Sequence, residues 1–140
     1  MRYMGLDIGD KRIGIALSFG VISQGLCTYK RINDDRDFEY IKKLVEENSV
    51  LKIIVGLPKN MNGSIGFQGK KVIEFCDELE KILSNEVIIE FIDERLTTVL
   101  ANNFMLEADI SRKKRRNIVD KIAAQIILQD YLDMSQKNQW

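Results

Sequence analysis

Two short apolar runs near the start of the chain, separated by a polar turn, predict a β-hairpin. The runs span residues 3 to 8 and 13 to 18 and are rich in aliphatic side chains. Between them, Gly9-Asp10-Lys11-Arg12 has the composition of a turn. A third strand is expected from Gly25 to Arg31.

The middle of the chain alternates between helical and extended patterns. After the capping sequence Asn33-Asp34-Asp35, apolar residues recur on one helical face as far as about Asn48. Residues 51 to 57 form the most strand-like run of the chain. A loop rich in asparagine and glycine is then expected from Pro58 to Gly66.

The second half of the chain contains three predicted helices. The first spans about Phe67 to Leu83, where apolar residues recur with helical spacing. A strand at residues 87 to 92 and a helix from Thr97 to Leu106 are expected to follow. A charged connection from Glu107 to Asn117 then leads to a helix from Ile118 to Leu132, which should be largely buried because it is apolar around most of its girth.

This order of elements predicts an α/β fold in a single domain that spans residues 1 to 140. The three leading strands pair antiparallel, whereas the later strands need crossover helices and join the sheet in parallel. A mixed five-stranded sheet with helices on both faces follows. A chain of 140 residues with 45% apolar content is sufficient for one core and too short for two ordinary domains.

The absence of histidine narrows the chemistry that the chain can perform. It excludes serine–histidine–aspartate or cysteine–histidine nucleophiles and histidine-containing zinc sites. Cys27 and Cys76 lie in apolar surroundings and are expected to be reduced, buried thiols. Catalysis would depend on carboxylates, lysines, hydroxyls or a metal bound by oxygen. Without a secretory signal or an apolar window of membrane length, the protein is expected in the cytoplasm, with no membrane association.

Two acids are expected at strand ends. Asp7 lies in the apolar first strand, where a charged side chain needs a partner. It could bind backbone amides of the turn at Gly9, or it could ligate a metal at the edge of the sheet. Glu94 follows the strand at residues 87 to 92, and ligands bind where parallel strands present their carboxyl ends. The alternative for Glu94 is an exposed ion pair with Arg95.

A third acid, Asp120, opens the last predicted helix. The helix dipole favours an acid in a first turn, and this alone would explain it. Ala124, one turn later on the same face, would let the helix lie close to the sheet and bring Asp120 toward the strand ends. Three such carboxylates would suit Mg²⁺ or Mn²⁺, which can activate water and stabilise the leaving oxygen in phosphodiester hydrolysis.

Four strings of the sequence, taken in order, resemble those of the YqgF/RuvX family. They are Met4-Gly5-Leu6-Asp7-Ile8-Gly9-Asp10-Lys11-Arg12-Ile13-Gly14, Ile54-Val55-Gly56-Leu57-Pro58-Lys59-Asn60-Met61-Asn62-Gly63, Asp93-Glu94-Arg95-Leu96-Thr97-Thr98 and Val119-Asp120-Lys121-Ile122-Ala123-Ala124. The resemblance covers essentially the whole chain. It implies a ribonuclease H-like fold, a relationship to RuvC Holliday junction resolvases, and an activity in processing the 5′ end of pre-16S ribosomal RNA.

By this resemblance, Asp7, Glu94 and Asp120 fall on the acidic positions of the family and are expected to be catalytic and to hold Mg²⁺ or Mn²⁺. RuvC-type resolvases carry a glutamate at the end of the fourth strand, whereas residues 57 to 66 here contain no acid. Glu94, from the fifth strand, is expected to take that place. Family members often have aspartate where this chain has Asn62. If that aspartate contributes to the metal site, this chain has lost the contribution; the expectation is instead that the loop from Pro58 to Gly63 is structural or touches substrate.

Positive charge is concentrated just before Asp120, although the whole chain is neutral, with 21 basic and 21 acidic residues. The run is Arg112, Lys113, Lys114, Arg115 and Arg116. It is expected to bind the phosphate backbone, and its alternative is a solvated loop. Further candidates for contact with nucleic acid are Lys11, Arg12, Asn60 and Arg95. No aromatic residues interleave the run, so base-specific recognition is not predicted.

The three acids predict a metal-dependent nuclease, and the family resemblance implies RNA as the favoured substrate and ribosomal precursor particles as partners. A Holliday junction resolvase-like DNA nuclease is one alternative. A non-catalytic RNA-binding factor in ribosome assembly is another. The expected oligomeric state is a monomer or a weak dimer.

Overall fold

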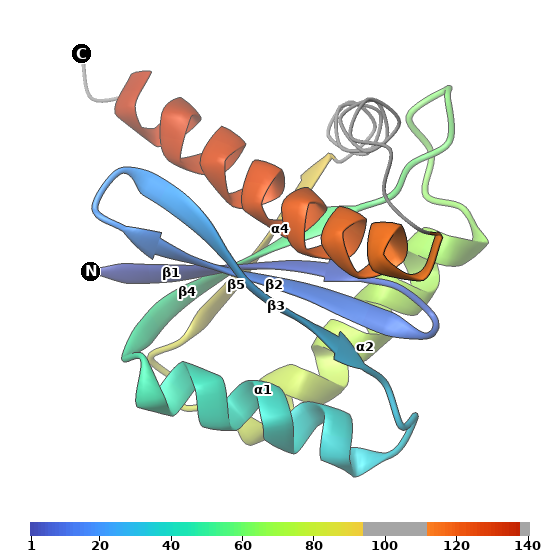
Figure 1. The fold of residues 1–140 in the computed structure, drawn as a ribbon, viewed down its shortest axis with the longest axis horizontal. Helices are drawn as coiled ribbons and strands as arrows, with labels where there is room; N and C mark the ends of the chain where they lie inside the picture. The colour runs from blue at the N-terminus through green and yellow to red at the C-terminus, as the bar shows by residue number, and fades with distance from the viewer. Residues whose placement is uncertain (94–111, 138–140) are drawn as a thin grey trace.

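The computed structural model describes the backbone of residues 1–93 and 112–137, and the side chains of all these except 112–117 and 137. Its elements are β1 (Arg2–Ile8), β2 (Arg12–Phe19), β3 (Ile22–Lys30), α1 (Asp35–Glu47), β4 (Val50–Leu57), α2 (Phe67–Ile82), β5 (Ile88–Asp93) and α4 (Arg112–Lys137). The strands form one sheet, with α4 on one face and α1 and α2 on the other (Figure 1).

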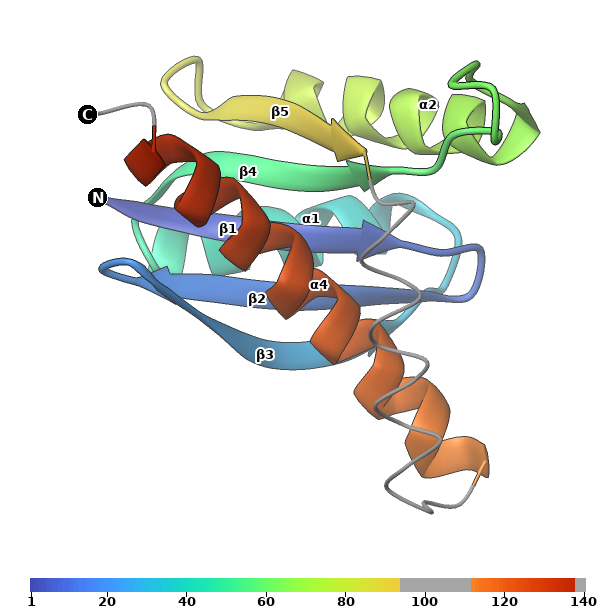
Figure 2. The same ribbon diagram turned by 90° about the horizontal axis from the view of Figure 1, so that it is seen from above.

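The sheet is mixed, as predicted. Its strand order is β3-β2-β1-β4-β5, which Figure 2 shows from above. β2 pairs antiparallel with both β1 and β3, whereas β1 with β4 and β4 with β5 pair in parallel. The carboxyl ends of β1, β4 and β5 consequently lie at the same edge of the sheet. β1 is the central strand of the five.

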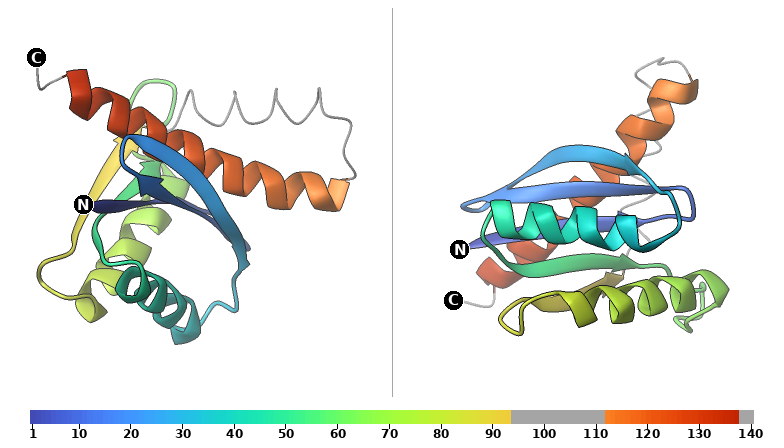
Figure 3. Two further views of the ribbon diagram at one scale, coloured as in Figure 1. Left: turned by 60° about the vertical axis from the view of Figure 1, so that its left-hand side comes forward. Right: turned by 90° about the horizontal axis from the view of Figure 1, so that it is seen from below.

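Successive side chains of the central strand, β1, point to opposite faces of the sheet, and the interior is divided into two hydrophobic cores. Met4, Leu6 and Ile8 of β1 belong to the larger core, which α1 and α2 cover. The two helices lie side by side on this face (Figure 3), where the rings of Phe38 and Phe75 stand 4.6 Å apart. Tyr3, on the opposite face of β1, packs against a smaller core, which contains Ala16, Ile54, Ala124, Ile127, Leu128 and Leu132.

Helix α4 is longer at its start than the sequence pattern predicted. It begins at Arg112, so the expected charged connection is wrong for residues 112 to 117. Arginine and lysine favour helices, and no glycine or proline interrupts this stretch. Asp120 consequently lies well inside the helix, where the dipole that acts on a first turn no longer explains an acid. The helix predicted from Thr97 to Leu106 lies outside the described residues.

Close contact between α4 and the sheet depends on two glycines. A Cβ atom at Gly5 would lie 2.7 Å from the carbonyl oxygen of Ala124, and one at Gly14 would overlap with that of Asp120. Ala124 itself is completely buried, which confirms the close approach predicted from its small side chain. The helix backbone therefore rests directly on β1 and β2.

The two cysteines are free thiols, as predicted, but their surroundings differ. Cys76 of α2 is buried, and burial raises the pKa of its thiol to about 12. Cys27 of β3 is only half-buried, and its sulfur lies 3.6 Å from the hydroxyl of Tyr40. Among the helices that the structure describes, none is long and apolar enough to cross a membrane.

Replacing Gly14 with alanine should lower the free energy of unfolding by about 3 kcal/mol, the upper end of the usual cost of overpacking a core, because the obstacle is helix backbone. Gly25→Ala is the matched control, since a Cβ there meets side-chain atoms of Lys121 and Gln125, which can move. Denaturation by urea measures both losses. Equal losses in the two variants would contradict the direct contact between helix and sheet.

Candidate metal and nucleic-acid site

Asp7 stands near the carboxyl end of β1, on the sheet face that α4 covers. Tyr3 and Gly5, at alternate positions of the same strand, both contact elements of that face. Asp7 is half-buried and pairs in register with Gly14 of β2. Gly14 in turn lies against the main chain of Asp120. The fold thus brings two of the three predicted acids together from opposite ends of the chain.

Asp120 is held by an ion pair with Arg12. The Nε atom of Arg12 lies 2.9 Å from Oδ2 of Asp120, and the two side chains are 28% and 24% exposed. Burial raises the pKa of Asp120, and the hydrogen bond and positive charge of Arg12 act in the opposite direction. Burial has the larger effect, so the pKa of Asp120 is raised on balance, and the cation of Arg12 offsets part of this effect.

Arg12 has a contact that the sequence did not suggest. It was predicted as a phosphate-binding residue, and in the structure its guanidinium is engaged by Asp120. The neighbouring Lys11 is exposed on the turn between β1 and β2. Contact of either residue with a phosphate stays a prediction.

The third predicted acid, Glu94, and its neighbour Arg95 lie outside the described residues. Strand β5 ends at Asp93, which pairs in register with Leu57 at the end of β4, on the same sheet edge as Asp7. Over residues 1–93 and the described part of α4, no three acidic, cysteine or histidine side chains form a group that could hold a metal. Two carboxylates with water ligands are nevertheless a donor set that suits Mg²⁺ or Mn²⁺.

The loop between β4 and α2 is held by its own hydrogen bonds. Oδ1 of Asn62 accepts from the amide and the hydroxyl of Ser64, at 3.0 and 2.6 Å. Nδ2 of Asn60 donates to the same hydroxyl at 3.0 Å, and its side chain also occupies the space beside Gly66. Asn62 and Asn60 therefore stabilise the loop, and contact of Asn60 with nucleic acid stays a prediction.

The basic run lies on α4 directly before Asp120. Residues 112 to 116 are helical, and Arg116 precedes Asp120 by four residues, about one turn. The side chains of this run are not among those described. Its backbone nevertheless places five cationic residues within about three helical turns of Asp120, and their contact with nucleic acid stays a prediction.

The signal for the contact between α4 and the sheet was present in the sequence. Gly5, Gly14 and Ala16 are small residues that occupy one face of two adjacent strands. A glycine inside a strand often marks the close approach of another backbone. The partner helix could not be identified from this signal, because the contact joins residues more than a hundred positions apart.

Replacing Arg12 with glutamine should raise the pKa of Asp120 further, because burial would then act without an opposing charge. A raised pKa in the folded state favours the protonated acid. The stability lost in the variant should therefore be small in acid and grow as the pH rises above the ordinary carboxyl range. NMR titration of the carboxyl carbon and denaturation at several pH values measure the two effects.

The control is Arg36→Gln, which breaks an exposed ion pair with Asp34. This change should leave the pKa of Asp120 as it was. If Arg12→Gln also leaves it unchanged, the ion pair in the structure does not exist in solution.

Comparison with known proteins shows relatives along the full length of the chain. Residues 1–134 match the family model described as "RuvX: Holliday junction resolvase". A protein of Thermoanaerobacter pseudethanolicus named "Putative pre-16S rRNA nuclease" is 55% identical over 141 residues, which cover 99% of both chains. A protein of Clostridium kluyveri with the same name is 52% identical, over 98% of this chain and 100% of its own.

Solved structures confirm the fold at much lower identity. RuvC of T. thermophilus, in complex with a Holliday junction substrate, has a TM-score of 0.54 at 12% identity, over 98% of this chain and 96% of its own. The fowlpox virus Holliday junction resolvase has a TM-score of 0.54 at 16% identity, over 96% and 99%. The ribonuclease H-like fold is thus confirmed. The match of residues 1–134 to the RuvX family model shows that the chain belongs to the RuvX family.

Proposed function

We propose that this protein is a divalent-metal-dependent nuclease that hydrolyses phosphodiester bonds at the 5′ end of pre-16S ribosomal RNA during ribosome biogenesis. The observation that carries the proposal is the meeting of Asp7 and Asp120 on the α4 face, in a chain without histidine. The names of the relatives that match at above 50% identity support the choice of substrate.

In this proposal Asp7 and Asp120, with Glu94 following the end of β5, hold Mg²⁺ or Mn²⁺. When bound there, such an ion would supply an activated water and would stabilise the leaving oxygen. Asp120 must be ionised to act as a ligand, and Arg12 favours that form against the effect of burial. The backbone of Asp7 is fixed by its place in the central strand, so this ligand needs little rearrangement.

The basic run of α4 is proposed to bind the phosphate backbone beside this site. Positive charges near the start of a helix are opposed by the helix dipole, so the charge of these residues does not stabilise α4. Five of them next to Asp120 would attract a polyanion and release its counterions. Lys11, Arg12, Asn60 and Arg95 are proposed as further contacts at the sheet edge.

A second candidate substrate is a four-way DNA junction. The description of the family model favours it, as does the likeness in fold to a RuvC that was solved with such a junction. A side-by-side assay on a pre-16S precursor and a four-way junction distinguishes the two substrates. Binding of RNA without cleavage of either would identify a non-catalytic assembly factor instead.

With Mn²⁺ present, the purified protein should cleave the precursor. Asp7→Asn, Glu94→Gln and Asp120→Asn should each lower kcat on the order of a thousandfold, since loss of metal-ion stabilisation costs several kcal/mol. The matched control is Asp10→Asn, which changes an exposed acid of the same turn. Gel analysis of the cleavage products measures all four. Cleavage that survives the three site substitutions would rule out the proposed site.

Replacing Arg115 and Arg116 with alanine should weaken binding to single-stranded RNA and reduce the slope of log affinity against log salt by about 1.4, or roughly 0.7 for each phosphate contact. Fluorescence anisotropy at several salt concentrations measures the slope. The control variant replaces Lys42 and Lys43 of α1 with alanine, which removes the same charge on the opposite face of the sheet. Equal slopes in both variants would show that the run is only solvated.

A further inference from the structure

The turn between β1 and β2 separates two residues of the proposed site, Asp7 and Arg12. Within the turn, the amide of Gly9 donates to the carbonyl oxygen of Arg12 at 2.9 Å. Arg31, just after the end of β3, adds two contacts from outside the hairpin. Its amide donates to the carbonyl oxygen of Lys11 at 2.8 Å, and its Nη1 donates to that of Gly9 at 2.7 Å.

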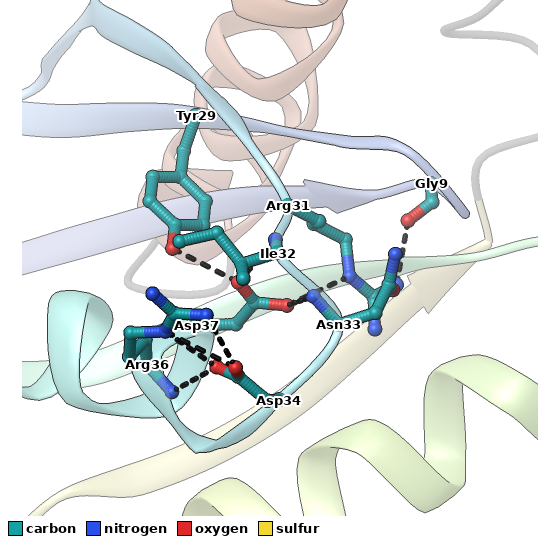
Figure 4. Close-up of polar contacts among 8 residues, drawn as sticks. All are labelled: Gly9, Tyr29, Arg31, Ile32, Asn33, Asp34, Arg36 and Asp37. Atoms are coloured by element: carbon teal, nitrogen blue, oxygen red, sulfur yellow. Dashed lines mark hydrogen bonds and ion pairs between the residues drawn. The ribbon is translucent and has the colours of Figure 1, made fainter.

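The guanidinium of Arg31 has two further contacts, one of which, with Asp37, is drawn in Figure 4. Its Nε donates to Oδ2 of Asp37 at 3.3 Å, and its Cζ lies 4.9 Å from the ring centroid of Phe75. The Arg31 side chain is 17% exposed. An arginine held by a carboxylate, an aromatic ring and a carbonyl has little freedom to change conformation.

Asp37, in the first turn of α1, is a rigid anchor for this arginine. It is 1% exposed, and its oxygens also accept from the hydroxyl of Tyr29 and the amides of Ile32 and Asn33, at 2.8 to 3.0 Å. Burial acts to raise the pKa of Asp37, and these hydrogen bonds outweigh it and lower the pKa. The carboxylate is therefore ionised and fixed by the loop that wraps around it.

We propose that Arg31 is a positioning residue for the site, because it joins the buried carboxylate of Asp37 to the carbonyl of Gly9 and so fixes the turn between Asp7 and Arg12. This inference rests on the proposed function. Arg31 contacts the turn from the side of α1 and α2, whereas Asp7 and Asp120 lie on the α4 face. It acts through the hairpin backbone and does not touch the substrate.

The geometry distinguishes this role from a simple contribution to stability. Asp37 already has three donors without Arg31, so the loop around it does not require the guanidinium. The bond to Gly9 reaches across the sheet edge to a segment that belongs to the site. By contrast, Asp10 on the same turn has exposed, long contacts of 3.4 Å to Lys71 and Gln68, which constrain the backbone little.

The test is Arg31→Lys, which keeps the charge but cannot reach Asp37 and Gly9 with two separate nitrogens in the geometry of the guanidinium. The matched control is Arg36→Lys, on the same side of the sheet, which alters only the exposed pair with Asp34. Three measurements are made at a temperature where all proteins are fully folded. They are amide hydrogen exchange at Gly9, Mn²⁺ affinity by calorimetry, and the kcat and KM of cleavage.

In Arg31→Lys, exchange at Gly9 should be about tenfold faster, and Mn²⁺ affinity and kcat should fall about tenfold, the usual effect of losing a group that orients metal ligands. KM should change much less than kcat, because the basic run of α4 is untouched. The control should match the wild type in every measurement. Unchanged exchange at Gly9, or exchange that changes while Mn²⁺ affinity and kcat do not, overturns the inference.

Failure of the proposed function gives a different result. A wild-type protein that neither binds Mn²⁺ nor cleaves nucleic acid rejects the nuclease proposal whatever Arg31 does, and the inference falls with it. A wild type that binds Mn²⁺ and cleaves, together with an unaffected Arg31→Lys variant, rejects only the role of Arg31.

Discussion

The direct contact between the backbone of α4 and the central strands is the constraint on which the rest of the site depends. Gly5 and Gly14 leave no side chain between helix and sheet, so Ala124 and Asp120 lie against β1 and β2. The small core of alanine, isoleucine and leucine side chains holds the helix in that place. Asp120 reaches the face of Asp7 only because this interface is thin, and the ion pair with Arg12 follows from the same approach.

Local patterns were sufficient for most of the fold. Apolar runs with a polar turn predicted the hairpin of β1 and β2, and the cap at Asp34 marked the start of α1 as the structure has it. The order of strands and helices then fixed which pairs are parallel, since a parallel pair needs a crossover. The predicted start of α4 was wrong, because clustered charge is typical of loops but arginine and lysine also extend helices readily.

Local patterns were not sufficient for the electrostatics of the site. Asp7 and Asp120 could be selected from sequence because an acid among apolar residues is costly. Their counter-charges could not, since Arg12 and Asp120 are 108 positions apart and nothing in either segment identifies the other. The same limit applies to Arg31, whose bond to Gly9 joins two loops that each have an ordinary turn composition. The candidate acids can therefore be predicted from sequence, whereas the residue that neutralises each acid is determined by tertiary packing.

Two arginines, Arg12 within the hairpin and Arg31 from the end of β3, connect the turn between β1 and β2 to the two faces of the sheet. Arg12 leaves the turn toward α4 and neutralises Asp120, whereas Arg31 reaches the turn from the side of α1 and α2 and is neutralised by Asp37. A shift of the Gly9 backbone would move Asp7 on one side and Arg12 on the other, because the residues are joined by one hydrogen-bonded loop. A site for a divalent cation needs its carboxylates held to a fraction of an ångström. Rigidity at this turn is therefore supplied from the α1 and α2 face of the sheet, opposite to Asp7 and Asp120.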